Sequence, residues 1–166
     1  MLLPVLLPVG TLALSEADII ATAALTHARS QNMSPLAVAV VDAAGTMKCL
    51  RCEDGAALMR PHIAYSKAWG CVGLGISTRK LFDLVQQMPQ MVPAFQSFMG
   101  ISENRLLPSP GGVLILRADA VIGAVGVSGD HPDHDEACAL AGIEGAGLAS
   151  FAVAILLALI CGPLNR

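Results

Sequence analysis

The stretch GAVGVSGDHPDHDEACA, residues 123–139, leads from an apolar, glycine-containing strand directly into a charged segment. Within seven residues this segment holds two imidazoles and four carboxylates. They belong to Asp130, His131, Asp133, His134, Asp135 and Glu136. Such a set could ligate a metal ion. However, Pro132 is typical of a first helical residue, and the helix dipole stabilises carboxylates in a first turn. We interpret the segment as a helix start near a ligand, with Asp130 and Glu136 as candidate ligand contacts and a metal site as the alternative.

Two β-hairpins are expected on the upstream side of this helix. The first joins residues 36–42 to residues 46–51, and the second joins residues 111–117 to residues 120–129. Each pair consists of apolar segments separated by a short turn, which is typical of antiparallel strands.

Helices are expected between and around the hairpins. The expected helices begin at Ser15, span residues 60–75 and 78–88, and begin again at Pro132. Pro89 and Pro93 predict a loop-rich segment after the third of these helices, because proline interrupts a helix interior. The order helix, hairpin, helices, hairpin, helix predicts an α+β fold, with an antiparallel sheet covered by helices.

The composition limits what the protein can do. Its 166 residues suit a single domain, which we place at residues 12–148. A net charge of −3 and the lack of a basic stripe argue against nucleic acid as a partner. Only 14% of the residues are charged and 54% are hydrophobic, which favours burial of apolar surface in a homo-oligomer, with a membrane-seeking segment as the alternative.

Both ends of the chain are apolar. Residues 1–11 have no basic residue before the apolar run and contain two prolines, so we expect no signal peptide and a cytoplasmic protein, with export as the alternative. Residues 149–166 form an atypical tail. The apolar run over residues 148–161 is shorter than the roughly 20 residues that span a bilayer, so a packed helix or an oligomer contact is expected and a membrane span is not.

The five cysteines form no disulfide framework, which agrees with a reducing compartment. Cys49 and Cys52 form a CxxC pair. On a strand, residues three apart point to opposite faces, so we expect ordinary thiols at these two positions.

Four segments together resemble the GlcG/HbpS-like family, which contains haem-binding and haem-degrading proteins and is similar to the C-terminal domain of PduO-type corrinoid adenosyltransferases. These segments are residues 40–55, 60–70, 108–115 and 122–148. The resemblance implies a five-stranded antiparallel sheet and assembly into homo-oligomers, from dimers to octamers. It also implies that haem or a small organic acid binds near subunit contacts.

The sequence departs from the family pattern at several positions. His62 stands where relatives usually carry an acidic residue, and Cys52 stands where arginine is common. The turn at Ala118 and Asp119 is shorter than usual, and the apolar tail matches nothing in the family.

His62 and His27 are the candidate haem-iron ligands, because neutral imidazole suits iron. The chain has no CxxCH motif, so haem would bind non-covalently. Arg60 and Lys67 could pair with ligand carboxylates, as could Arg79.

The backbone N–H groups of Gly111 and Gly112 could approach a ligand carboxylate closely, because glycine has no side chain in the way. A bend at the start of the strand is the alternative explanation for these glycines.

Two functions follow from these residues. The first is a non-covalent haem- or tetrapyrrole-binding homo-oligomer that assists haem degradation or sensing. The second is a tautomerase- or hydrolase-like enzyme of organic-acid or aromatic catabolism, in which Lys67 and Glu136 supply the acid–base groups. Lys67 could instead form a salt bridge to Glu53, Asp54 or Glu136. A third hypothesis is a structural or sensory interaction module that binds neither haem nor a small-molecule substrate.

Overall fold

Five strands form one antiparallel sheet in the computed structural model, which describes residues 11–150. The strand order is β2-β1-β4-β3-β5. The strands are β1 (Ala37–Asp42), β2 (Met47–Cys52), β3 (Gly112–Arg117), β4 (Ala120–Ser128) and β5 (Ala149–Ser150). The antiparallel α+β fold expected from the sequence is confirmed, and both predicted hairpins are present. The fifth strand is only two residues long and lies just after the predicted boundary at Leu148.

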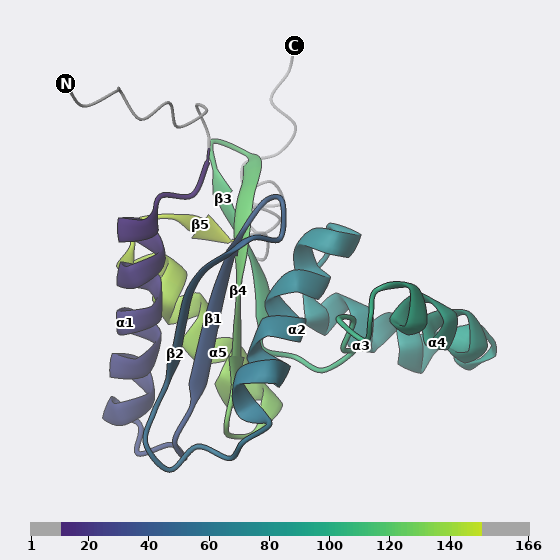
Figure 1. The fold of residues 1–166 in the computed structure, drawn as a ribbon, viewed down its shortest axis with the longest axis horizontal. Coiled ribbons are helices and arrows are strands. Elements are labelled where there is room, and N and C mark those ends of the chain that lie inside the picture. Colours follow the sequence, from purple (N-terminus) through teal and green to yellow (C-terminus); the bar gives the residue numbers. More distant parts are fainter. Residues whose placement is uncertain (1–10, 151–166) are drawn as a thin grey trace.

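Helices cover both faces of the sheet (Figure 1). The helices α1 (Leu14–Ser30) and α5 (Pro132–Gly145) pack against each other on one face, and α2 (Arg60–Leu74) lies on the other. The first helix begins one residue before Ser15. Ser15 does not cap it; instead, the carboxylate of Glu16 accepts the N–H of Ala13 at 2.9 Å.

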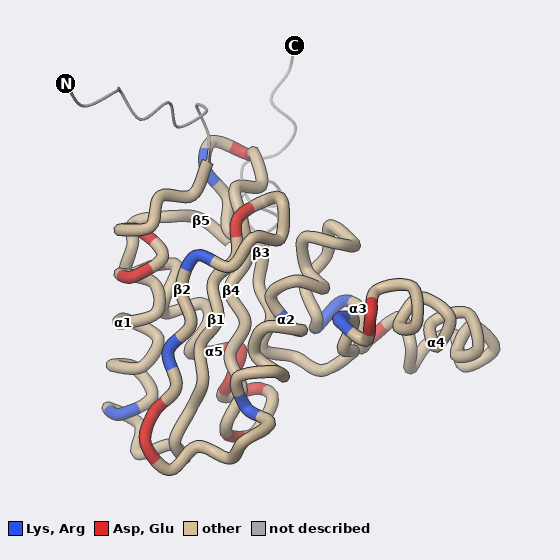
Figure 2. Tube along the Cα trace, viewed as in Figure 1, with Lys and Arg blue, Asp and Glu red and all other residues tan. Residues whose placement is uncertain are grey.

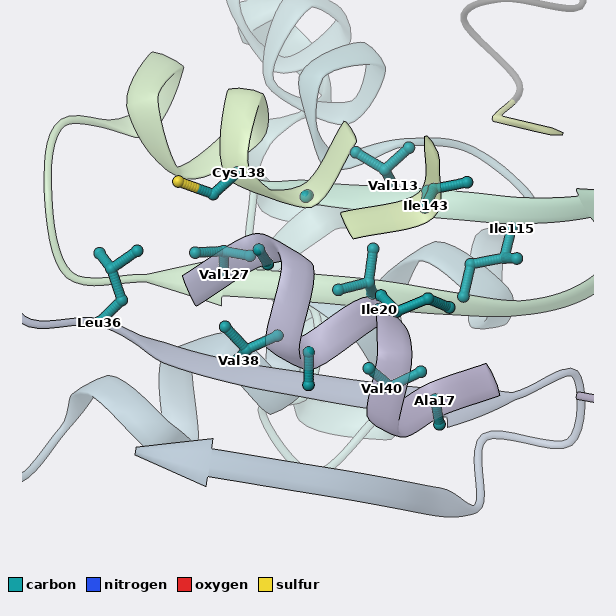
Figure 3. Close-up of a cluster of buried hydrophobic side chains, with 14 of the residues drawn as sticks. Ala17, Ile20, Leu36, Val38, Val40, Val113, Ile115, Val127, Cys138 and Ile143 are labelled. Carbon is teal, nitrogen blue, oxygen red and sulfur yellow. The ribbon is translucent and has the colours of Figure 1, made fainter. Parts of the chain in front are cut away.

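The main core lies between the sheet and the α1–α5 pair (Figure 3). Ile20 of α1 and Ile143 of α5 meet Val38 and Val40 of β1 there, and all four are fully or almost fully buried. The residues of β1 that alternate with Val38 and Val40 point to the opposite face of the sheet, where they contact α2. Because β1 is central and covered on both faces, it reads as an unbroken apolar run and shows no alternation with polar residues.

The face that meets α2 is built from small residues, which let the helix approach the strands closely. Ala39 and Ala64 pack together on this face. At Gly126, a Cβ atom would lie 2.1 Å from the carbonyl oxygen of Ala64. The absence of a side chain at Gly126 therefore allows α2 to pack this close to β4.

The expected loop-rich segment is instead largely helical, and this prediction was wrong. It contains a 3-10 turn, η1 (Pro89–Met91), and the helix α4 (Val92–Ile101). The two prolines stand in the first turn of these elements, where a missing N–H breaks no hydrogen bond, so they begin helices and do not interrupt them. Together with α3 (Thr78–Gln87), these elements form an arm over residues 78–101 that extends away from the sheet (Figure 1).

No helix within residues 11–150 is both long enough and apolar enough to cross a membrane. The predictions for residues 1–10 and for residues 151–166 concern parts of the chain that lie outside the described residues. In the described part of the chain, Cys49, Cys52, Cys71 and Cys138 are free thiols.

Candidate functional site

A buried ion pair lies where α2, the end of β4 and the start of α5 meet. Lys67 and Asp135 each expose only 2% of their side chains, and Lys67 Nζ lies 2.9 Å from Asp135 Oδ2. The ammonium also donates to the carbonyl of Val127 at 2.9 Å. Burial lowers the pKa of Lys67, an effect that the charge of Asp135 opposes. Burial raises the pKa of Asp135, and Lys67 opposes that shift.

Lys67 thus forms a salt bridge, which the sequence offered as one of two alternatives, but its partner is Asp135 and not Glu53, Asp54 or Glu136. Asp135 is 68 residues away in the chain. It reaches Lys67 because α5 starts directly beyond the end of β4. Glu136 also lies close enough for its charge to raise the pKa of Lys67.

Gly111 and Gly112 are packed against the protein's own atoms. Gly111 has φ +120°, and a Cβ there would lie 2.7 Å from Lys67 Nζ. The N–H of Gly112 donates to Thr78 Oγ1 at 2.8 Å. Gly111 therefore leaves room for the buried pair, and Gly112 joins the strand to the start of α3. A contact between either glycine and a ligand stays a prediction.

The charged segment around Pro132 is a helix start, as the sequence indicated. Asp130, the candidate ligand contact that precedes the helix, accepts the N–H groups of Ser34 at 2.8 Å and His131 at 2.7 Å. The ring of His134 lies 2.9 Å from the same carboxylate. These hydrogen bonds hold the pKa of Asp130 well below its usual range. Across residues 11–150, no three His, Cys, Asp or Glu side chains form a group that could hold a metal ion.

Glu136 is held by Arg79, which ties the arm to α5. Arg79 Nε donates to Glu136 Oε2 at 2.9 Å, and the same guanidinium pairs with Asp133. These hydrogen bonds raise the pKa of Arg79 above its ordinary value. Arg60 lies at the edge of this charged region, where its guanidinium is 3.4 Å from Ser128 Oγ. The structure therefore brings Lys67 and Glu136 into one region but gives each its own partner.

His62 lies in a different place, at a surface pocket beside the N-terminal half of α2. The pocket has a volume of about 520 Å³. It is lined by Met59, His62, Ile63, Tyr65, Ser66, Met99, Glu103, Asn104, Arg105, Leu106 and Leu107. Within residues 11–150, the exposed imidazole of His62 has no hydrogen-bond or ion-pair partner. The guanidinium of Arg105 pairs with Glu103 and lies 4.9 Å from the ring centroid of Trp69.

His27 lies on the opposite side of the molecule. It borders a shallow groove of about 600 Å³ on α1, together with Asp18, Ile19, Thr22, Ala23 and Thr26. Because α1 and α2 cover opposite faces of the sheet, the two candidate iron ligands of one chain cannot meet on one haem.

Several residues of these sites were not found from the sequence. Tyr65 follows His62 at helical spacing, so the periodicity of α2 could have shown that both reach one surface. Met99 and Arg105 come from the end of the arm and the segment after it, and no local signal links them to α2.

The geometry of the fold agrees with the comparison to known families. Residues 12–144 match the model of a family described as haem degrading protein HbpS-like. The chain belongs to this family.

Solved structures that are similar to this chain include the following three. The complex of PduOC with haem is 25% identical, with a TM-score of 0.74, over 84% of this chain and 98% of that chain. The protein ORFY of Klebsiella pneumoniae is 25% identical, with a TM-score of 0.76, over 89% and 98% of the two chains. A double mutant of HbpS from Streptomyces reticuli is 26% identical, with a TM-score of 0.70, over 87% and 92%.

One curated relative is much longer. The corrinoid adenosyltransferase PduO of Salmonella typhimurium is 28% identical over 114 residues, which are 69% of this chain and 33% of that protein. This chain therefore spans about a third of the relative's length.

Proposed function

We propose that this protein binds haem non-covalently at the His62 pocket and acts as a homo-oligomer. One observation carries the proposal. The imidazole of His62 lines a largely apolar pocket and has no hydrogen-bond or ion-pair partner within residues 11–150. Membership of the HbpS-like family and the similarity to the PduOC–haem complex support it. Assistance in haem degradation or sensing, and a cytoplasmic location, are the finer parts of the same proposal.

The residues around this pocket fit haem. His62 would ligate the iron through a neutral ring nitrogen. Ile63, Met99 and Leu107 offer apolar surface to the macrocycle, which would otherwise face water. Arg105, which stacks on Trp69, would supply a cation for a propionate by exchanging its exposed ion pair with Glu103 for the ligand's carboxylate. The iron itself supplies the redox chemistry when haem is bound.

Titration with haemin tests the proposal. The wild-type protein should show a saturable shift of the Soret band. His62→Ala should weaken haemin binding by about tenfold or more, since it removes an iron ligand. His27→Ala is the matched control, because it removes a histidine from the opposite side of the molecule, and it should bind like the wild type. A wild-type protein without a saturable shift would contradict haem binding, and loss of binding in His27→Ala alone would move the site to α1.

The alternative, an enzyme that uses Lys67 and Glu136, has less support from the geometry. A substrate would have to reach an ammonium group that is 2% exposed and already bound by Val127 and Asp135. Turnover of 2-oxo or hydroxy acids that is lost in Lys67→Ala, in a variant that remains folded, would favour this alternative.

A further inference from the structure

A second apolar pocket, which the haem proposal does not use, lies between α5 and β5 at the edge of the main core. Its volume is about 440 Å³, which is within the range of small-ligand sites, roughly 300–1,000 Å³. The side chains of Leu140, Ile143 and Leu148 supply its apolar walls. These residues pack on the α1–α5 face of the sheet, whereas the His62 pocket lies on the α2 side.

The turn after α5 holds one side of this pocket in place. Gly147 has φ +68°, the left-handed conformation that often ends a helix. Its N–H donates to the carbonyl of Glu144 at 2.8 Å, and the N–H of Leu148 donates to the carbonyl of Ile143 at 3.2 Å. This pair of hydrogen bonds is the Schellman motif. It fixes the chain between α5 and β5, so the pocket is formed by the fold itself.

The hydroxyl of Ser150 is the polar group inside the pocket. Ser150 is 3% exposed and lies opposite Ile115 in the pairing of β3 with β5. Directly opposed residues of antiparallel strands point to the same face, and Ile115 belongs to the main core, so Ser150 Oγ points toward α5. Within residues 11–150, it is the one buried side-chain oxygen or nitrogen without a hydrogen-bond partner in the protein. Leaving a buried hydroxyl unpaired is unfavourable, so a bound molecule that pairs with it gains affinity.

The charge around the pocket limits the class of ligand. Residues 137–150 contain one charged residue, the exposed Glu144, and Figure 2 shows β5 without charges. Glu144 lines the pocket, and its carboxylate disfavours an anionic ligand because like charges repel. The aliphatic walls favour a molecule whose surface is mainly apolar.

We propose that this pocket binds a small, uncharged and mainly apolar molecule that carries one hydroxyl or carbonyl group. The polar group of the ligand shares a hydrogen bond with Ser150 Oγ, and its hydrocarbon part lies against Leu140, Ile143 and Leu148. The site is on the other face of the sheet from His62, so its test is independent of haem binding.

Titration of the full chain with benzyl alcohol, followed by methyl NMR spectroscopy, tests the location of the site. The methyl signals of Ile143 should shift and reach saturation. Leu140→Trp should weaken binding about tenfold or more, because the larger side chain takes up space in the pocket. The remaining methyl signals show whether the variant is folded. The absence of a saturable Ile143 shift, or a shift confined to Ile63 in the His62 pocket, would overturn the proposal.

Three related probes test the class of ligand. Ser150→Ala should weaken the binding of benzyl alcohol about three- to tenfold, the effect of one neutral hydrogen bond, and should leave the binding of toluene unchanged. Ser97→Ala is the matched control, because Ser97 is an exposed serine on α4, and it should bind both probes like the wild type. Benzoate should bind more weakly than benzyl alcohol, and Glu144→Gln should reduce that difference. Equal losses for toluene and benzyl alcohol in Ser150→Ala would contradict the role of the hydroxyl.

Discussion

At the scale of single residues, the buried pair of Lys67 and Asp135 is the strongest electrostatic feature of the fold. Removing one partner leaves the other as an unpaired group in a site with almost no solvent contact. We expect Lys67→Met or Asp135→Asn to lower the free energy of unfolding by about 3–5 kcal/mol. The double variant should lose less than the sum of the two, because it leaves no isolated charge.

Urea denaturation measures this effect. Lys80→Met is the matched control, because Lys80 is an exposed lysine on α3, and it should change stability by less than about 0.5 kcal/mol. Additive losses in the double variant would show that the two side chains act independently, which the 2.9 Å contact argues against.

Asp130 should make stability depend on acid pH. Its pKa is lowered in the fold from its ordinary value of 3.8, mainly by the N–H groups of Ser34 and His131. As the pH falls through about 4, the unfolded chain takes up a proton before the folded chain does, so the stability from this group is lost on acidification. Asp130→Asn should cost about 1–2 kcal/mol at neutral pH, since it removes one acceptor oxygen, and this difference should shrink below pH ~4.

Unfolding curves collected from neutral pH down to pH ~3 test this sign. Asp119→Asn, in the exposed turn between β3 and β4, should follow the wild-type curve. A difference between Asp130→Asn and the wild type that grows on acidification would contradict the assignment.

At the scale of the elements, the contact between α2 and the sheet depends on Gly126. An added Cβ would lie 2.1 Å from the carbonyl oxygen of Ala64, and backbone atoms cannot turn aside as a side chain can. Gly126→Ala should therefore destabilise the protein by about 1–3 kcal/mol or more by lifting α2 off β4. Thermal unfolding measures the loss. Gly100→Ala is a suitable comparison, because an added Cβ there meets no atom within 4 Å, and the wild-type melting temperature in Gly126→Ala would contradict the close contact.

The elements also show which features of the fold a sequence can predict. The hairpins and the helices α1, α2, α3 and α5 could be predicted because apolar spacing and turn residues are local signals. The helix α4 could not be predicted because a proline is typical of a helix break as well as of a first helical turn, and Pro93 stands in the first turn. The partner of Lys67 could not be predicted either. Its pairing with Asp135 spans 68 residues and depends on how α2 and α5 meet at the end of β4.

At the scale of the whole molecule, the sheet keeps the two candidate iron ligands apart. His62 belongs to the α2 side and His27 to the α1 side, so each could serve only its own site within one chain. If the His62 pocket is the haem site, each chain should bind one equivalent of haem. A haem shared between two chains would instead give half an equivalent per chain.

Haem stoichiometry therefore separates these arrangements. Titration of the wild type with haemin, followed at the Soret band, should reach its endpoint at one equivalent per chain. His27→Ala should keep that endpoint, and the His27→Ala/His62→Ala double variant should lose no more affinity than His62→Ala alone, because distant sites contribute independently. An endpoint of half an equivalent, with binding abolished by either single substitution, would mean that His27 of one chain and His62 of another ligate the same iron. That result would contradict a pocket built around His62 alone.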